Sequence, residues 1–221
     1  MLKRLIFPLI LGLAGLAVLV SLGLWQVERL RWKEGVLAGI EAAIAAPPVA
    51  LPAAPDPARD AYLPIAVSGQ LTGEGARVLA SVKGLGAGHR LIGVLEADGR
   101  RLLVDLGFVP LEGDLTQPAG PVALKGNLHW PDEQNRHTPA PDLVKGLWFA
   151  RDIDGLSTVL KTEPVLIVTR DPVVPQAIPI PVDTAHIPND HLGYAVTWFG
   201  LALVWAGMTI LYLWRITRRT S

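Results

Sequence analysis

The sequence predicts a membrane protein in which two transmembrane α-helices flank a β-rich extracytoplasmic domain. Two apolar runs, residues 5–25 and 191–214, are long enough to cross the hydrocarbon core of a bilayer. Between them, short apolar runs alternate with glycine and proline, a pattern typical of strands joined by turns. Half of the 221 residues are hydrophobic and the mean hydropathy is +0.36, which suits a soluble domain with a few membrane spans.

Charge and cysteine content exclude several classes of protein. Twenty basic residues balance twenty acidic ones, so nothing indicates a nucleic-acid binder. The chain has no cysteine, which excludes disulfides, thiolate zinc sites, iron–sulfur clusters, covalent c-type haem attachment and thiolate copper relays. A chain without thiols is also suited to an oxidising compartment.

The first apolar run predicts an uncleaved membrane anchor with the N-terminus in the cytoplasm. It continues to Trp25 and then meets "QVERLRWK", whereas a cleaved signal peptide would be shorter. Basic residues near the two chain ends outnumber those that follow the first span by five to three, so both termini are expected in the cytoplasm and the segment between in the periplasm of a bacterium. The five are Lys3, Arg4, Arg215, Arg218 and Arg219, and the three are Arg29, Arg31 and Lys33. No Arg- and Ser-rich presequence precedes the first span, which argues against a mitochondrial precursor.

The segments follow one another in an order set by periodicity and proline content. Apolar residues recur at helical spacing beyond the first span, and prolines then stop the helix and recur before the second span. The expected segments are a cytoplasmic tail (1–4), the first span (5–25), a helical extension (26–45), a Pro-rich spacer (46–60), the β-rich domain (61–171), a Pro-rich strap (172–190), the second span (191–214) and a basic cytoplasmic tail (215–221).

The β-rich domain is predicted from six short strand-like runs and one helix, "DIDGLSTVL". The dipeptide Asp98-Gly99 between two of the runs is a strong hairpin signal. A sandwich or a partly closed barrel would accommodate these strands. The runs are "YLPIAVSGQL", "RVLASV", "HRLIGVLEA", "RRLLVDLGFV", "VALKGNLHW" and "PVLIVTR".

No catalytic motif stands out in this domain, so we do not expect an enzyme. The sequence lacks G-x-S-x-G, a Walker loop and H-E-x-x-H, and the glycine-rich "KGLGAG" fits a turn better than a phosphate loop. His129 and His137 flank "WPDEQNR". This segment could hold a metal ion or could be a polar surface loop, and the loop is favoured. His89, beside Arg90, is expected to cap a strand or face water.

The second span has two contrasting faces when residues are placed 100° apart. Gly193, Gly200 and Gly207 form a smooth stripe, which is expected to pack on the first helix or on a partner subunit. The opposite face carries a histidine, two tryptophans and two alanines that would leave a depression between the indoles, where a flat apolar macrocycle could lie. Its members are His191, Ala195, Trp198, Ala202 and Trp205.

His191 would then reach the metal of that macrocycle. The positive end of the helix dipole lowers the affinity of imidazole for protons, and neutral imidazole is the form that ligates iron. The alternative is that His191 bonds lipid headgroups or helps Asn189 and Asp190 to cap the helix.

Three stretches, "LGLWQVERLRWK", "LLVDLGFVP" and "NDHLGYAVTWFGLAL", resemble signatures of the surfeit locus protein 1 family. The resemblance covers nearly the whole chain, and the Trp-Gln-x-x-Arg-x-x-Trp-Lys run and the Asn-x-His-x-x-Tyr run are its specific parts. In the middle stretch the family typically has Asn-Arg-Gly-Trp, whereas this chain has Asp105-Leu106-Gly107-Phe108.

The resemblance implies an assembly factor for haem–copper cytochrome c oxidase that inserts or protects haem a in subunit I. Its partners would be subunit I, assembly intermediates, haem a synthase and membrane lipid, in a bacterial inner membrane. In bacterial relatives the histidine that matches His191 is implicated as a ligand of the haem iron. The site implied here consists of His191, Tyr194, Trp198, Trp25, Gln26 and Arg29.

Each of these residues has an expected part in the site. A two-span hairpin would bring Gln26 and its neighbours close to His191, where Arg29 could pair with a haem propionate and Trp25 could line the ring. Trp25 could equally be an interfacial anchor, and His186 is a weaker candidate for a second iron ligand.

Two other functions compete with haem a handling. One is a cofactor-free membrane scaffold that holds oxidase intermediates through its periplasmic domain. The other is a membrane-anchored periplasmic enzyme, which the missing motifs disfavour, and the missing thiols also argue against a copper-delivery factor.

Overall fold

The computed structural model describes residues 2–185 and 187–218. The expected iron ligand His186 and the basic residue Arg219 lie outside the described residues, as do the side chains of Lys3 and Arg4. The chain divides into two compact units, one made of Met1–Gly39 with Thr184–Ser221 and the other of Ile40–Asp183. Each unit is described by itself.

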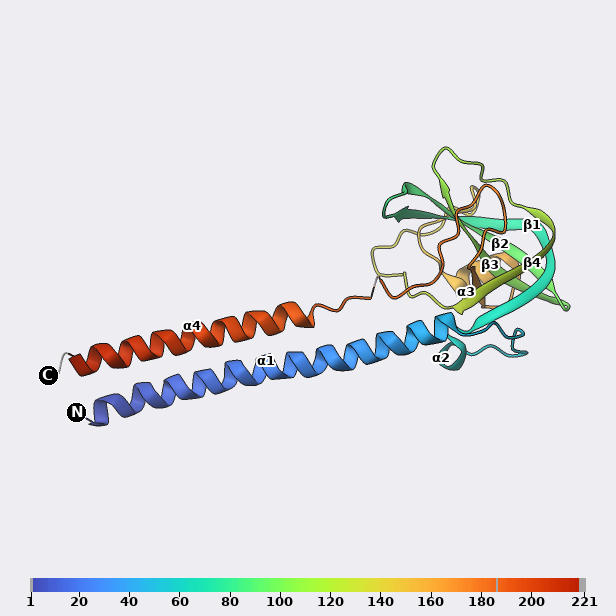
Figure 1. The fold of residues 1–221 in the computed structure, drawn as a ribbon. Helices are drawn as coiled ribbons and strands as arrows, with labels where there is room; N and C mark the ends of the chain where they lie inside the picture. The colour runs from blue at the N-terminus through green and yellow to red at the C-terminus, as the bar shows by residue number, and fades with distance from the viewer. Residues whose placement is uncertain (1, 186, 219–221) are drawn as a thin grey trace. The chain divides into compact units, whose positions relative to one another are not determined.

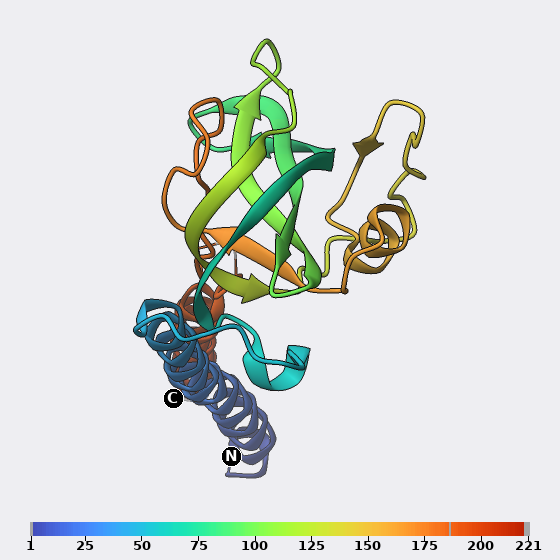
Figure 2. The same ribbon diagram turned by 90° about the vertical axis from the view of Figure 1, so that its right-hand side faces the viewer.

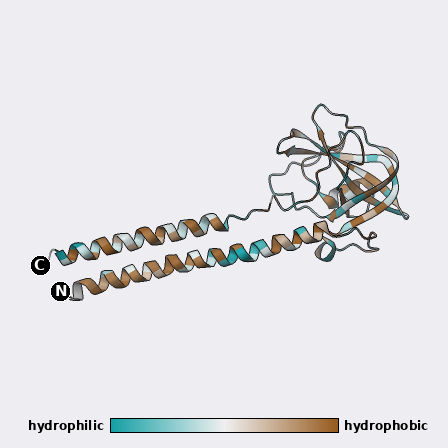
Figure 3. Cartoon of the chain, in the orientation of Figure 1, coloured by the Kyte–Doolittle hydropathy of each residue, from teal (hydrophilic) through white to brown (hydrophobic). Residues whose placement is uncertain are grey.

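The first unit is built from α1 (Leu2–Ala45) and α4 (His191–Arg218), which Figure 1 shows in blue and red. Among the described residues, these two helices are long and apolar enough to cross a membrane. Figure 3 shows the brown apolar part of α1 giving way to a teal hydrophilic stretch, which corresponds to "QVERLRWKE". The prediction of two apolar helices around a β-rich domain is confirmed, and so is the helical extension over residues 26–45.

The second unit is a β-barrel in which five strands close into a ring (Figure 2). The ring runs β1-β2-β3-β6-β4 and returns to β1, so the sandwich alternative is wrong. All neighbours in the ring are antiparallel except β3 and β6, which are parallel. The strands are β1 (Pro64–Val82), β2 (Gly86–Ala97), β3 (Arg100–Pro110), β4 (Ala119–His129), β5 (Leu147–Trp148) and β6 (Leu166–Thr169), with helices α2 (Pro57–Asp60) and α3 (Ile153–Leu160).

Closure depends on the length of β1, because one half of it pairs with β4 and the other with β2. We expected two strands here, separated by "TGEGA", but the chain passes through a bulge between Leu71 and Gly75 and continues as one strand. Such a bulge bends a strand and increases its twist, which is what a closing sheet needs. The hairpin at Asp98-Gly99, the helix in "DIDGLSTVL" and the turn in "KGLGAG" are confirmed.

Apolar residues from alternate positions fill the barrel and cover one side of it. The interior cluster includes Leu91, Leu95 and Val104, which are fully buried. The residues between them in sequence, such as Ile92 and Leu103, face outward and are covered by α3 and Trp148. Both faces of β2 and β3 are therefore buried, which explains why these runs read as continuously apolar.

The Pro-rich segment 46–60 belongs to the barrel domain, so its prediction as a spacer is wrong. Val49 exchanges main-chain hydrogen bonds with the first residues of β1, at 3.0 and 2.9 Å. Leu51 packs on the interior cluster, and Arg100 donates to the carbonyl oxygen of Pro52 at 2.8 Å. The prolines exclude a helix but not this extended pairing at a strand end.

The strap that follows β6 pairs with β3 at Phe108. Phe108 and Ile178 exchange two main-chain hydrogen bonds, of 2.7 and 2.8 Å. Gly107 has φ of +121°, and a Cβ there would collide with the backbone of Ile178. Glycine in the "LLVDLGFVP" stretch is therefore required by the close passage of the strap.

The last turn of α1 lies in the barrel unit and is capped by barrel side chains. Asn127, which is almost fully buried, donates to the carbonyl oxygens of Ile44 and Tyr62, at 3.3 and 2.7 Å. Arg170 donates to the same Ile44 oxygen, and its Nε donates to Asn127 Oδ1 at 2.7 Å. A cation is favourable at a helix C-terminus, where carbonyl groups lack helical partners.

Replacing Arg170 by alanine should destabilise the barrel domain by about 2 kcal/mol, because charged hydrogen bonds are lost and a helix end is left uncapped. Urea unfolding of the full-length protein in detergent would measure the change. Arg136→Ala, in an exposed loop, is the matched control and should change stability by less than about 0.5 kcal/mol. Equal stability of both variants would contradict the capping role.

Candidate functional site

The first residue of α4, His191, lies against a polar side chain of α1. Nδ1 of His191 is 2.8 Å from Oε1 of Gln26, and Gln26 is only 8% exposed. Because an amide oxygen can only accept a hydrogen bond, this contact fits the tautomer in which Nδ1 carries the ring proton and Nε2 keeps its lone pair. Metal-binding histidines are commonly held in this way, with one nitrogen donating to an oxygen and the other left for the metal.

Glycines on α1 and bulky side chains on α4 set the approach of the two helices. Trp205 fills the space that a Cβ on Gly15 would need, and its Nε1–H donates to the carbonyl oxygen of Gly12 at 2.9 Å. Phe199 fills the corresponding space at Gly23. Small residues permit such close approach, which brings the polar pair into hydrogen-bond distance.

The expectation that the α4 glycine stripe packs on α1 is wrong, and the alternative that it packs on a partner subunit stays a prediction. A Cβ added to Gly193, Gly200 or Gly207 would meet nothing within 4 Å, so this stripe faces away from α1. The physical reason is that the glycine hollows of α1 accept large side chains, which lie on the other face of α4.

The predicted depression below His191 is also filled. Ala195 and Ala202 are 2% and 4% exposed, because their face of α4 is the one that packs on α1. A macrocycle cannot lie over these alanines, so any flat ligand of His191 must lie on a side of the helix pair.

Of the six residues predicted for the site, Gln26 is the one that hydrogen-bonds to His191. Trp25 and Tyr194 are more than half exposed, and Trp198 is half-buried. Arg29 is exposed, with its guanidinium stacked 4.5 Å from the centre of the Trp32 ring.

The helical repeat places these side chains on the same flank of the helix pair as Trp205. Steps of about 100° put Trp198 and Tyr194 within roughly 20° of the Trp205 direction on α4. On α1, Arg29 and Trp25 fall within roughly 80° of Gly15, the glycine that Trp205 covers. Phe199 and Gly23 mark the opposite flank, so the side with Trp205 gathers the arginine and the aromatic residues predicted for the site.

Asn189 is a further polar group at this end of α4, which the sequence suggested only as a helix cap. Its Oδ1 is buried and has no hydrogen-bond partner among the described residues. A buried acceptor without a donor costs free energy and is uncommon in folded proteins. It lies two residues before His191.

The barrel contains a second polar cluster, centred on Asp105. This carboxylate is fully buried and accepts from Arg90 Nε at 2.6 Å and from Arg151 Nη1 at 3.3 Å. Arg151 also binds Glu133 through its side chain and its backbone N–H. Burial by itself would raise the pKa of Glu133, but these bonds to Arg151 outweigh it and hold that pKa below its usual value.

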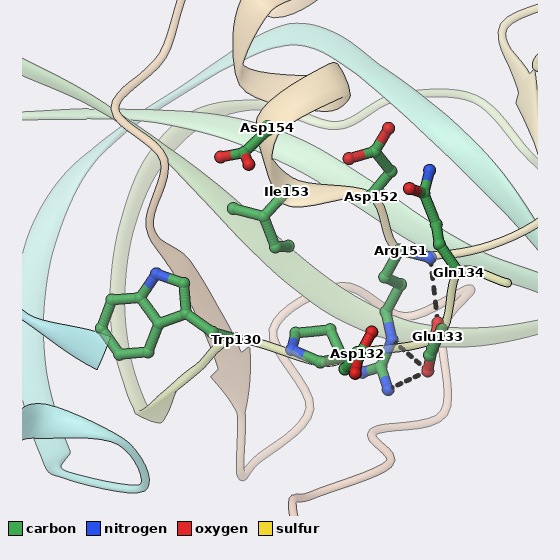
Figure 4. Close-up of a pocket in the computed structure, with 9 residues that line it drawn as sticks. Trp130, Asp132, Glu133, Gln134, Arg151, Asp152, Ile153 and Asp154 are labelled. Atoms are coloured by element: carbon green, nitrogen blue, oxygen red, sulfur yellow. Dashed lines mark hydrogen bonds and ion pairs between the residues drawn. The ribbon is translucent and has the colours of Figure 1, made fainter. Parts of the chain in front are cut away.

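A pocket of about 230 Å³ opens beside this cluster (Figure 4). Two of its acidic groups already have structural partners, since Glu133 binds Arg151 and Asp152 caps α3 by accepting from the N–H of Gly155. The cluster therefore joins the loop after β4 to the start of α3. The lining residues are Trp130, Pro131, Asp132, Glu133, Gln134, Arg151, Asp152, Ile153 and Asp154.

The barrel histidines occupy different environments. His137 lies in an exposed loop, where it accepts from Arg136 Nε at 2.9 Å. His89 is 9% exposed, so the prediction that it caps a strand or faces water is wrong; burial, with Arg77 nearby, lowers its pKa. Among the described residues, no three His, Asp or Glu side chains are grouped to hold a metal ion.

His129 should make the barrel less stable in acid. Burial, reinforced by Arg151, lowers its pKa from 6.5 to about 4. As the pH falls from about 6.5 to about 4, the unfolded chain binds a proton that the folded chain does not, so stability falls; below pH 4 this contribution stops changing. Urea midpoints between pH 4 and 7 should depend less steeply on pH in His129→Gln than in the wild type. The exposed control His137→Gln should keep the wild-type slope, and an unchanged slope in His129→Gln would contradict the assignment.

Comparison with known proteins gives a consistent family. The SURF1 family model matches residues 13–203. The chain is 26% identical to Surfeit locus protein 1 of Rattus norvegicus, over 92% of this chain and 74% of the rat protein. It is 27% identical to Surfeit locus protein 1 of Homo sapiens, over 81% of this chain and 69% of the human protein. It is 29% identical to the SURF1-like protein of Rickettsia bellii, over 92% of this chain and 87% of that protein. The resemblance inferred from the three signature stretches is thus confirmed, and the chain belongs to the SURF1 family.

Proposed function

We propose that this protein is an assembly factor for haem–copper cytochrome c oxidase that binds haem a through His191. The observation that carries the proposal is the hydrogen bond from His191 Nδ1–H to Gln26 Oε1, which leaves Nε2 available as an iron ligand. Family membership supports the assembly role, and the free ring nitrogen supports haem as the cargo.

The residues around His191 fit a haem. His191 Nε2 would ligate the iron, Arg29 would pair with a propionate, and Trp25, Tyr194 and Trp198 would contact the ring. The haem would lie on the flank that these side chains share, and not on the alanine face of α4, which α1 covers. Bound haem a would supply a Lewis-acidic iron, a large apolar ring and two carboxylates.

The chain would span a bacterial inner membrane twice, with both termini in the cytoplasm and the barrel in the periplasm. The apolar helices support the spanning, and the excess of basic residues at the chain ends supports the orientation. Arg29 stacked on Trp32 suits the polar boundary of a bilayer, because both side chains have an apolar body and a polar part.

In this setting the protein would deliver haem a to subunit I or protect it there, with assembly intermediates, haem a synthase and membrane lipid as its other partners. His191 would hold the cargo at the outer end of the helix pair, and the aromatic flank would shield it from water. No catalytic step is assigned to the chain.

Full-length protein purified from cells that make haem a should carry haem, and His191→Ala should lose at least about 90% of it, because the iron ligand is removed. The optical spectrum and the haem-to-protein ratio measure this. His137→Ala, an exposed histidine of the barrel, is the matched control and should keep the wild-type ratio.

A His191→Ala protein with stoichiometric haem would overturn the role of this residue. Wild-type protein that lacks haem and still co-purifies with subunit I would instead support the cofactor-free scaffold.

Orientation can be tested with single cysteines, since the chain has none. A membrane-impermeant maleimide added to spheroplasts should label Ser81→Cys on the barrel and leave Thr217→Cys near the end of α4 unlabelled. Lysis should expose both positions. The reverse pattern would contradict a periplasmic barrel.

A further inference from the structure

We infer that Gln26 is a positioning residue, which fixes the Nδ1–H form of His191 and presents Nε2 to the haem iron without itself touching haem. This inference rests on the proposed function for the identity of the metal. The sequence predicts that Gln26 contacts the cofactor directly, whereas here Gln26 contacts His191, the residue that would bind the iron.

Burial and packing make Gln26 suited to this role. The residue is 8% exposed, and its Oε1 is engaged by His191 at 2.8 Å. One turn earlier on α1, Gly23 receives Phe199 of α4, so the backbone beside Gln26 is held against the second helix. Few rotamers of a buried amide keep this contact, and the imidazole is therefore oriented as well as protonated at one nitrogen.

The register of both helices explains why these two residues meet. Gly12, Leu19 and Gln26 are spaced by seven on α1, and His191, Trp198 and Trp205 are spaced by seven on α4. Residues at this spacing keep nearly the same direction along a pair of packed helices. Of the three α1 residues, Gln26 alone has a side chain that can form hydrogen bonds, and it lies opposite His191 of α4.

The choice of an amide rather than a carboxylate has a chemical consequence. A carboxylate beside Nδ1–H draws the proton and makes the imidazole a stronger electron donor to iron. A neutral amide accepts the same hydrogen bond without that effect. Gln26 therefore keeps the iron–histidine bond weaker than a carboxylate would, which is suited to cargo that must be released.

The experiment compares full-length wild type with Gln26→Leu and Gln26→Glu, with Gln134→Leu in an exposed loop as the matched control. Nitrogen-15 NMR of the haem-free proteins, labelled at histidine, reports which nitrogen of His191 carries the proton. Haem dissociation rates and reduction potentials are measured on the loaded proteins.

Gln26→Leu should lose the uniform Nδ1–H form of His191, and its haem should dissociate about tenfold faster or more, since contacts of this kind contribute 10- to 100-fold to metal affinity. Gln26→Glu should keep the Nδ1–H form, release haem more slowly than the wild type and have a lower reduction potential. Gln134→Leu should match the wild type in all three measurements.

An unchanged His191 tautomer in Gln26→Leu would overturn the positioning role, and so would faster haem loss in Gln26→Glu. If the wild type binds no haem but the tautomer changes in Gln26→Leu, the positioning role stands and the proposed function fails. Gln26→Glu keeps a hydrogen-bond acceptor at the buried position, so the test survives if Gln26→Leu does not fold.

Discussion

The fit of large α4 side chains into glycine hollows of α1 is the constraint on which the helix unit depends. Trp205 at Gly15 and Phe199 at Gly23 fit the rotation of α4 about its axis that the structure shows. That rotation places His191 opposite Gln26, buries the small residues between the indoles and turns the other glycine stripe outward. A change in the size of either hollow would therefore disturb the polar pair.

In the barrel, polar side chains connect segments that are far apart in the sequence. Asp105 joins β2 to the segment before α3 through two arginines, and Asn127 with Arg170 joins β4 and β6 to the end of α1. These bonds pair a buried charge at Asp105 and a backbone carbonyl group at the end of α1. Either group would cost free energy if it were left without a partner. The chain segments that enter and leave the barrel are thus fixed by side chains of the barrel itself.

The elements of the fold could be predicted from the sequence wherever a strong local pattern was present. Asp98-Gly99 specifies its hairpin through turn geometry, and the apolar runs specify both long helices. The single strand β1 could not be foreseen, because "TGEGA" has the composition of a loop and becomes a bulge only when both partners pair with it. Val49 and its neighbours were assigned to a spacer because proline content does not reveal pairing with a distant strand.

The candidate site was predictable in its residues but not in its arrangement. His191 and Gln26 belong to recognisable signature stretches, and a hairpin of helices brings such stretches together. Which face of α4 packs on α1 depends on the shapes of both helices, so the glycine stripe of α4 alone does not identify that face. The seven-residue spacing of Gln26 from Gly12 was the available signal for a buried amide.

The strap has a consequence for how firmly the chain is held as it leaves the barrel. It is joined to the sheet by the Phe108–Ile178 pair and by Arg90, which donates to the carbonyl oxygen of Ile180 at 2.9 Å. Val174 and Ala177 of the strap are also buried in the interior cluster. Detaching the strap would therefore expose apolar side chains of the barrel core as well as break hydrogen bonds, and both cost free energy. Arg90 also binds Asp105, so one arginine of β2 holds the buried carboxylate and the departing chain together.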